Sequence, residues 1–259
     1  MSTLRKIFVF LLWTPVIAVG GFLVFTIPPV LSLRWADPVR TAFMWRQPGP
    51  VAQTWVPLVR ISPALQSSVV SAEDANFYDH FGVDFREMRA SWKKNQRKKK
   101  YARGFSTIPM QLAKNLYLVS YKNMIRKALE IGIAFEMEAL LSKERILELY
   151  LNLVEWGPGV YGAEAAARRY FKKPAEALGS NEASFLAAIL PNPKRWGRWP
   201  PGPYVSARMN ALQVRSGLAR AKNLPPIPDL PENGNETEGD REEEAAPPAE
   251  RGEPIPQDL

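Results

Sequence analysis

The sequence predicts a mostly α-helical domain between an N-terminal transmembrane helix and a disordered C-terminal tail. Residues 7–33 form an uncharged run of 27 residues, and about 20 apolar residues are enough for a helix to cross a bilayer. Apolar residues then recur at helical spacing over residues 50–224, with almost no alternating β pattern. The last 35 residues combine eight prolines with 11 acids, and such a segment buries too little apolar surface to fold.

The apolar N-terminal run has a second interpretation, as a signal peptide cleaved near Ala18-Val19-Gly20. The run continues well past that point, which favours an uncleaved anchor by length. Its orientation is ambiguous, because Arg5 and Lys6 precede it while further arginines follow it closely.

Start and stop signals divide the body into helices. Ser62-Pro63 is typical of a helix start, because serine caps the first turn and proline is tolerated there. Ser142 is expected to cap a helix that carries a long apolar stripe, and Asn181 a later one. The other predicted helices cover residues 108–118, 123–141 and 162–171.

Composition limits the chemistry that the chain can perform. There are no cysteines and a single histidine, His80, so disulfides, thiolate nucleophiles and histidine metal clusters are excluded. We interpret His80 as a helix-end hydrogen bonder, which leaves acid–base chemistry to carboxylates, lysines and tyrosines. The tail carries a net charge of −9 and the whole chain carries +8, so residues 1–224 carry a net charge of +17. A body this basic is expected to bind anionic partners: nucleic acid, lipid headgroups or a phosphate-bearing substrate.

Glu73 is the first candidate for catalysis. It follows Val69 by four residues and precedes Phe77 by four, so a continuous helix would place it on their apolar face. Burial there would raise its pKa toward the range of a general base. The alternative is a glutamate at the edge of the face that reaches solvent or a nearby lysine.

A second polar group lies on the helix predicted over residues 108–118. Ser106 or Thr107 can cap this helix, and Gln111, Lys114 and Asn115 share one of its faces. A helix start beside a lysine suits a phosphate-bearing ligand, whereas the alternative is a solvated face.

A third group is the pair Arg126 and Glu130, one helical turn apart. Such a pair can be a simple ion pair on the surface. The apolar residues that follow it favour an interior cleft instead.

Together these groups resemble the ordered motifs of the family 51 glycosyltransferases, which include class A penicillin-binding proteins and monofunctional biosynthetic peptidoglycan transglycosylases. The similarity covers about residues 50–220, and four motifs in order are far more specific than one. The motif residues are 73–82, then Ser106-Thr107-Ile108 with Gln111 and Lys114-Asn115, then Arg126-Lys127 with Glu130, then 143–152.

The resemblance implies a lysozyme-like fold and the polymerisation of lipid II into glycan strands. Glu73 would deprotonate the acceptor 4-hydroxyl, which attacks the donor's anomeric carbon with inversion and releases undecaprenyl pyrophosphate. Lys114 and Arg126 would neutralise the pyrophosphate. Glu130 would act beside the leaving group, either by organising Arg126 or by binding a divalent cation.

The remaining motif residues would contact the substrate. Gln111 and Asn115, with Ser106 and Thr107, would position it or shape the cleft. No cofactor is implied, although a divalent cation, Mg or Mn, near the pyrophosphate stays open.

The resemblance also implies the topology. Because lipid II is presented outside the cytoplasm, residues 1–6 would be cytoplasmic, 7–33 would cross the inner membrane once, and 34–224 would be periplasmic, followed by the tail at 225–259. Expected partners are lipid II, the growing glycan strand and membrane lipids, with other cell-wall synthases or divisome proteins left open and no nucleic acid.

The chain departs from the family pattern at Phe105, Pro109 and Met110, where a small residue, Thr or Ser, and Gln are usual. These changes motivate an alternative function, a catalytically impaired lipid II-binding or divisome scaffold on the same fold.

Seven basic residues lie between the first two motifs, over residues 93–103. With Trp92 and Tyr101 nearby, they would in isolation suggest nucleic-acid binding. A charge run otherwise predicts a solvated or disordered loop. In an anchored protein we favour contact with anionic lipid headgroups.

Overall fold

The computed structural model describes residues 3–98, 106–118 and 123–217 of the 259-residue chain. The predicted tail at 225–259, Phe105, and the basic residues from Lys99 to Arg103 lie outside the described residues.

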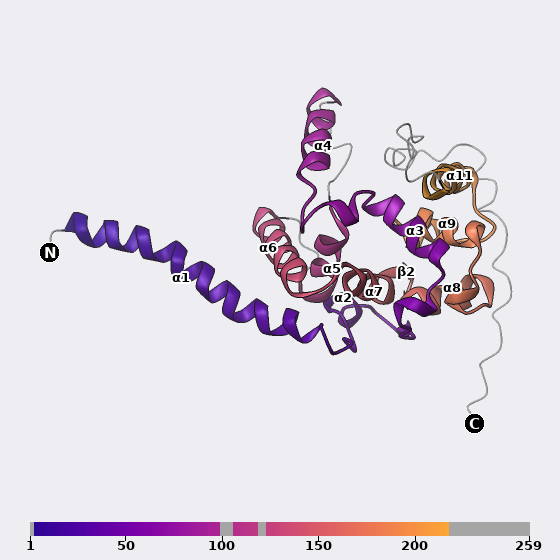
Figure 1. The fold of residues 1–259 in the computed structure, drawn as a ribbon, viewed down its shortest axis with the longest axis horizontal. Coiled ribbons are helices and arrows are strands. Elements are labelled where there is room, and N and C mark those ends of the chain that lie inside the picture. The colour runs from indigo at the N-terminus through magenta and orange to yellow at the C-terminus, as the bar shows by residue number, and fades with distance from the viewer. Residues whose placement is uncertain (1–2, 99–105, 119–122, 218–259) are drawn as a thin grey trace.

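The described chain is mostly helical, as predicted (Figure 1). Its α-helices are α1 (Thr3–Ser32), α2 (Ala42–Trp45), α3 (Pro63–Glu73), α4 (Phe85–Lys98), α5 (Ile108–Tyr117), α6 (Met124–Leu140), α7 (Lys143–Leu153), α8 (Ala163–Phe171), α9 (Ser180–Ile189), α10 (Pro193–Trp196) and α11 (Pro203–Gly217). Three short 3-10 turns join them, η1 (Leu58–Arg60), η2 (Phe77–Asp79) and η3 (Ala175–Ala177).

The first helix extends away from the body of the protein (Figure 1). Its segment Trp13–Ser32 is the one stretch of the described residues that is long and apolar enough to cross a membrane. Large apolar side chains such as Val16, Ile17 and Phe25 are exposed along it, as expected of a helix that faces lipid. The helix is therefore consistent with a single-pass membrane anchor.

The second half of α1 packs on α6. Phe22 covers Gly132, where an added Cβ would lie 2.8 Å from the phenyl ring. One turn further, the Thr26 hydroxyl donates a 2.7 Å hydrogen bond to Oε1 of Glu136, which is buried. The last turn brings Val30 into the core, so the anchor is fixed to the domain by packing as well as by the chain.

Local capping signals were mostly predicted correctly. Ser62 caps α3 and Ser142 caps α7, as predicted, each through its side-chain oxygen, and Asn123, for which no cap was predicted, caps α6 in the same way. The expected cap at Asn181 is wrong, because α9 begins at Ser180 and its N-cap is Gly179, two residues earlier. The Glu182 carboxylate instead accepts the Gly179 N–H at 2.9 Å.

The helix α4 was not predicted, and the expectation of a loop is wrong for residues 93–98. Asp84 Oδ1 accepts the backbone N–H groups of Arg86 and Glu87 at 2.9 and 3.0 Å, which is the bonding of an N-cap. The helix projects from the body (Figure 1), and its exposed side chains are both basic and aromatic.

Two groups of helices form the core. The helices α3, α9 and α11 pack on one another, while α5 packs between α6 and α7. Buried residues of both groups join in one cluster that includes Leu65, Leu112, Leu147 and Phe185. This arrangement brings the end of α3 to the beginning of α5, where the predicted site residues lie.

A small sheet lies beside the helices, although the sequence showed almost no β pattern. Its strand order is β1 (Ala52–Gln53), β3 (Val160–Tyr161), β2 (Glu155–Gly157), with β1 parallel and β2 antiparallel to β3. After β3, Gly162 has φ +82, and a Cβ there would lie 2.7 Å from the carbonyl oxygen of Asn152.

We expect Gly162→Ala to destabilise the domain by about 1–3 kcal/mol, because alanine is strained at positive φ and its methyl group meets backbone. Gly217→Ala is the matched control, since a Cβ there meets nothing within 4 Å. Urea unfolding in detergent measures both variants. Equal stability of the two would contradict this account of Gly162.

Candidate active site

Glu73 is the last residue of α3 and is half-buried. Its Oε2 accepts a 2.8 Å hydrogen bond from the side-chain amide of Gln111 on α5. The expected helical relation to Phe77 is wrong, because α3 ends at Glu73 and Phe77 lies in the 3-10 turn η2. The side chain of Glu73 therefore points to α5 because the two helices meet, not because of a continuous apolar face.

The next residue, Asp74, joins α3 to α5. Its Oδ2 accepts the backbone N–H of Ile108, the first residue of α5, at 2.9 Å. His80 Nε2 lies 2.9 Å from both carboxylate oxygens, so the histidine supports a helix end, as the sequence suggested.

Thr107 occupies the N-cap position of α5 but makes no side-chain cap. Its hydroxyl instead donates to the carbonyl oxygen of Gly82 at 2.6 Å, and Asp74 supplies the cap. The N–H of Ile108, one of the groups that could bind a phosphate at the start of α5, is therefore already in use. The lysine and arginine near this helix remain the better candidates to bind phosphate.

The surroundings of Glu73 act on its pKa in opposing directions. Burial raises the pKa above the ordinary glutamate value, and the charge on Asp74 adds a smaller increase. The hydrogen bond from Gln111 and the positive charges of Arg208 and Lys114 lower it. The balance leaves the pKa raised, which favours proton uptake by this carboxylate.

A second cluster surrounds Glu130 on α6. Glu130 is buried, and its two oxygens pair with Arg126 and with Lys127, the latter at 3.1 Å. Lys127 Nζ also lies 3.3 Å from the Ser106 hydroxyl. The carboxylate thus holds two cations beside the beginning of α5.

Lys114 interacts electrostatically with both carboxylates, those of Glu73 and Glu130. Burial lowers its pKa, and Arg126 and Lys127 lower it further, while Glu130 and Glu73 act in the opposite direction. Glu130 thus pairs with two cations and interacts electrostatically with a third, Lys114, and three cations in this region suit a diphosphate. Asn115 follows Lys114 on α5 and is half-buried.

The donors in this cluster do not fit a divalent cation. Among the described residues, no group of three or more histidines, aspartates or glutamates is placed to hold a metal ion. Both oxygens of Glu130 are also already paired with cationic side chains.

Three residues of the site were given no role in the prediction, although the first two lie within the predicted motifs: Lys127, Tyr150 and Arg208. Tyr150 was included in the apolar stripe of its helix, and its buried hydroxyl donates to Gln111 Oε1 at 3.0 Å. Arg208 is buried on α11, 135 residues from Glu73 in sequence. Lys127 gave the clearest missed signal, because it adjoins Arg126 and is three residues from Glu130.

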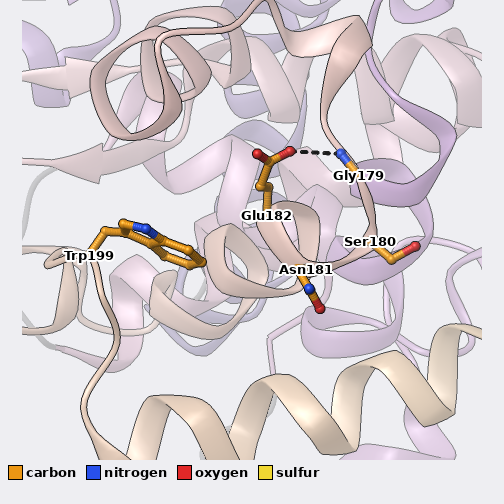
Figure 2. Close-up of a pocket in the computed structure, with 5 residues that line it drawn as sticks. All are labelled: Gly179, Ser180, Asn181, Glu182 and Trp199. Carbon is orange, nitrogen blue, oxygen red and sulfur yellow. Dashed lines mark hydrogen bonds between the residues drawn. The ribbon is translucent and has the colours of Figure 1, made fainter.

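A separate pocket of about 430 Å³ lies at the beginning of α9 (Figure 2). It contains none of the predicted site residues and is lined by Gly179, Ser180, Asn181, Glu182 and Trp199. The Ser62 hydroxyl donates to the Leu178 carbonyl at 2.7 Å, so this pocket is near the start of α3. Glu73 is at the other end of that 11-residue helix, which is about 16 Å long at 1.5 Å per residue.

Comparison with known proteins identifies the family. The family model described as "Transglycosylase" matches residues 42–215. Proteins named biosynthetic peptidoglycan transglycosylase are similar over most of their length. That of Rhodospirillum centenum is 40% identical over 210 residues, which cover 79% of this chain and 90% of the relative.

The corresponding protein of Aeromonas hydrophila is 45% identical over 201 residues, covering 74% of this chain and 84% of the relative. That of Pseudomonas syringae is 43% identical over 216 residues, covering 80% and 88%. The family match and these identities confirm the resemblance seen in the motifs, and the chain belongs to the transglycosylase family.

Proposed function

We propose that this protein is a peptidoglycan glycosyltransferase that polymerises lipid II into glycan strands, with Glu73 as its catalytic base. Membership of the transglycosylase family and the names of its relatives support the activity. The observation that carries the assignment of residues is the pairing of two centres. A half-buried carboxylate with a raised pKa lies beside a cluster of cations that is held by a buried glutamate.

The first centre supplies the base. Glu73 takes the proton of the acceptor 4-hydroxyl as the oxygen attacks the anomeric carbon of the donor. The new bond forms on the face opposite the departing group, so the configuration at that carbon is inverted. A raised pKa suits this role, because a stronger base takes the proton more readily.

The second centre receives the leaving group. The bond from the anomeric carbon to the pyrophosphate breaks with its electron pair on oxygen, and undecaprenyl pyrophosphate departs. Lys114, Arg126 and Lys127 offset the charge that develops there. Because both oxygens of Glu130 bind Arg126 and Lys127, we assign Glu130 the role of holding these cations in position.

The remaining predicted residues act around these centres. Gln111 donates a hydrogen bond to Glu73, and Ser106 accepts one from Lys127, so both residues shape the cleft. The Thr107 hydroxyl donates a hydrogen bond to the carbonyl oxygen of Gly82. We therefore assign Thr107 the role of fixing the chain before α5. Asn115 is proposed to contact the substrate.

Two of the three departures from the family pattern, Pro109 and Met110, do not favour an impaired scaffold. Met110 is fully buried and packs with Val83 and Ala134, so its thioether fills the core and does not replace a contact in the cleft. Pro109 is in the first turn of α5, where a missing N–H costs little.

We further propose that α1 crosses the inner membrane once, with the N-terminus in the cytoplasm and the body in the periplasm. Lipid II is presented on that side, and α1 is long and apolar enough to span. The exposed residues Phe85, Arg86, Arg89, Trp92 and Lys93 of α4 support contact with membrane lipids, because aromatic and basic side chains suit the interface.

We expect Glu73→Gln to reduce polymerisation of labelled lipid II by about 10²–10⁴-fold, the usual contribution of a general base. The control is Glu176→Gln, on the exposed turn η3, which should polymerise like the wild type. Purified proteins in detergent are compared by the length and amount of glycan formed. Polymer from Glu73→Gln at the wild-type rate would rule out Glu73 as the base.

The same variant should be more stable than the wild type near pH 7. The pKa of Glu73 is raised in the folded protein, so its ionised form destabilises the folded state above the ordinary glutamate pKa of about 4.3. The gain should shrink as the pH falls toward that value, because Glu73 is then protonated in both states. Thermal unfolding across this range measures it, and a gain that is constant with pH would contradict the argument.

A further inference from the structure

A chain of two hydrogen bonds links three helices at the proposed base. The Tyr150 hydroxyl on α7 donates to Gln111 Oε1 on α5 at 3.0 Å. The amide nitrogen of Gln111 then donates to Glu73 Oε2 on α3 at 2.8 Å. The hydrogen bond of the Tyr150 hydroxyl goes to Gln111 and not to the carboxylate, so Tyr150 acts on Glu73 through the glutamine.

The direction of this chain follows from the chemistry of the groups. A side-chain amide has one end that accepts and one end that donates, and an ionised carboxylate only accepts. If the amide of Gln111 were turned over, its oxygen would face the Glu73 oxygens and the hydrogen bond would be lost. The carboxylate already favours the orientation with the NH₂ group toward Glu73, and a donor at the far end of the amide adds to that preference.

Tyr150 is suited to be that permanent donor. It is almost fully buried, and burial, with the charges on Glu73 and Asp74, raises its pKa well above the ordinary value of 10. The phenol therefore keeps its proton at neutral and mildly alkaline pH. The other contact of the amide is weaker, because Gln111 Nε2 lies 3.5 Å from the Ser106 carbonyl oxygen.

We propose that Tyr150 is a positioning residue that orients the amide of Gln111 so that its NH₂ group holds and tunes the Glu73 carboxylate. The inference rests on the proposed role of Glu73 as the base. It assigns a function to a residue of the apolar stripe of α7, and it makes the geometry of the base depend on three helices.

Loss of the phenol should change the titration of the base. Without a donor at its oxygen, the amide turns over part of the time, and the hydrogen bond that lowers the pKa of Glu73 is weakened. The pKa of Glu73 should then rise. The other groups that act on Glu73 are Arg208, Lys114 and Asp74, and a change at Tyr150 leaves them in place.

The test is the pH dependence of lipid II polymerisation by full-length Tyr150→Phe. The ring is retained, so the core should remain packed, and the melting temperature checks this. We expect the acidic limb of the rate profile to move to higher pH. The rate should fall roughly threefold to tenfold on that limb, as for partial loss of a hydrogen bond to a charged group, and approach the wild-type rate at alkaline pH.

Two further variants make the test specific. Gln111→Ala should move the limb in the same direction, and adding Tyr150→Phe to it should cause no further shift, because the tyrosine acts only through the glutamine. Tyr161→Phe removes another buried phenol, in β3, and should leave the profile unchanged.

The outcomes separate this inference from the proposed function. An unshifted limb in Tyr150→Phe, a uniform loss of rate at all pH values, or additive shifts in the double variant would overturn the role of Tyr150 while Glu73→Gln remained inactive. Full activity in Glu73→Gln would instead overturn the base assignment, and the role of Tyr150 with it.

Discussion

The arrangement of the site depends on one buried carboxylate, that of Asp74, which connects the end of α3 to the beginning of α5. The N–H group that it accepts lies at the positive end of α5, where a negative charge is stabilised. This junction places Glu73 one residue away from the contact and Gln111 one turn into the next helix. Glu73 and its hydrogen-bond donor are therefore brought together by a helix cap formed between segments that are 34 residues apart.

Features with a local cause could be predicted from the sequence. The caps at Ser62, Asn123 and Ser142 depend on a side chain and an amide two or three residues away, so residue type and position are enough to identify them. The pair of Arg126 and Glu130 is local in the same way, because one helical turn separates its members. The order of the motifs along the chain indicated the glycosyltransferase reaction, which no single helix could indicate.

Features with a distant cause could not be predicted in the same way. Whether Glu73 faces Phe77 or Gln111 depends on where α3 ends, and that end is set by Asp74 through a contact with α5. Arg208 acts on Glu73 from α11, and neither residue carries a local signal of the other. The helix α4 was missed for a different reason, because its high charge obscured the capping signal at Asp84.

The contact between Thr26 and Glu136 has a consequence for how the protein reaches its substrate. The helix α6 that binds the anchor also carries Arg126 and Glu130 on its first turns. With α1 in the bilayer, the cation cluster is held at a constant depth relative to the lipid surface, and it cannot approach or leave that surface independently of the anchor. A substrate that keeps its hydrocarbon tail in the bilayer would present its diphosphate at a constant depth as well. Encounter between the two then becomes a search in the plane of the membrane, in two dimensions and not three.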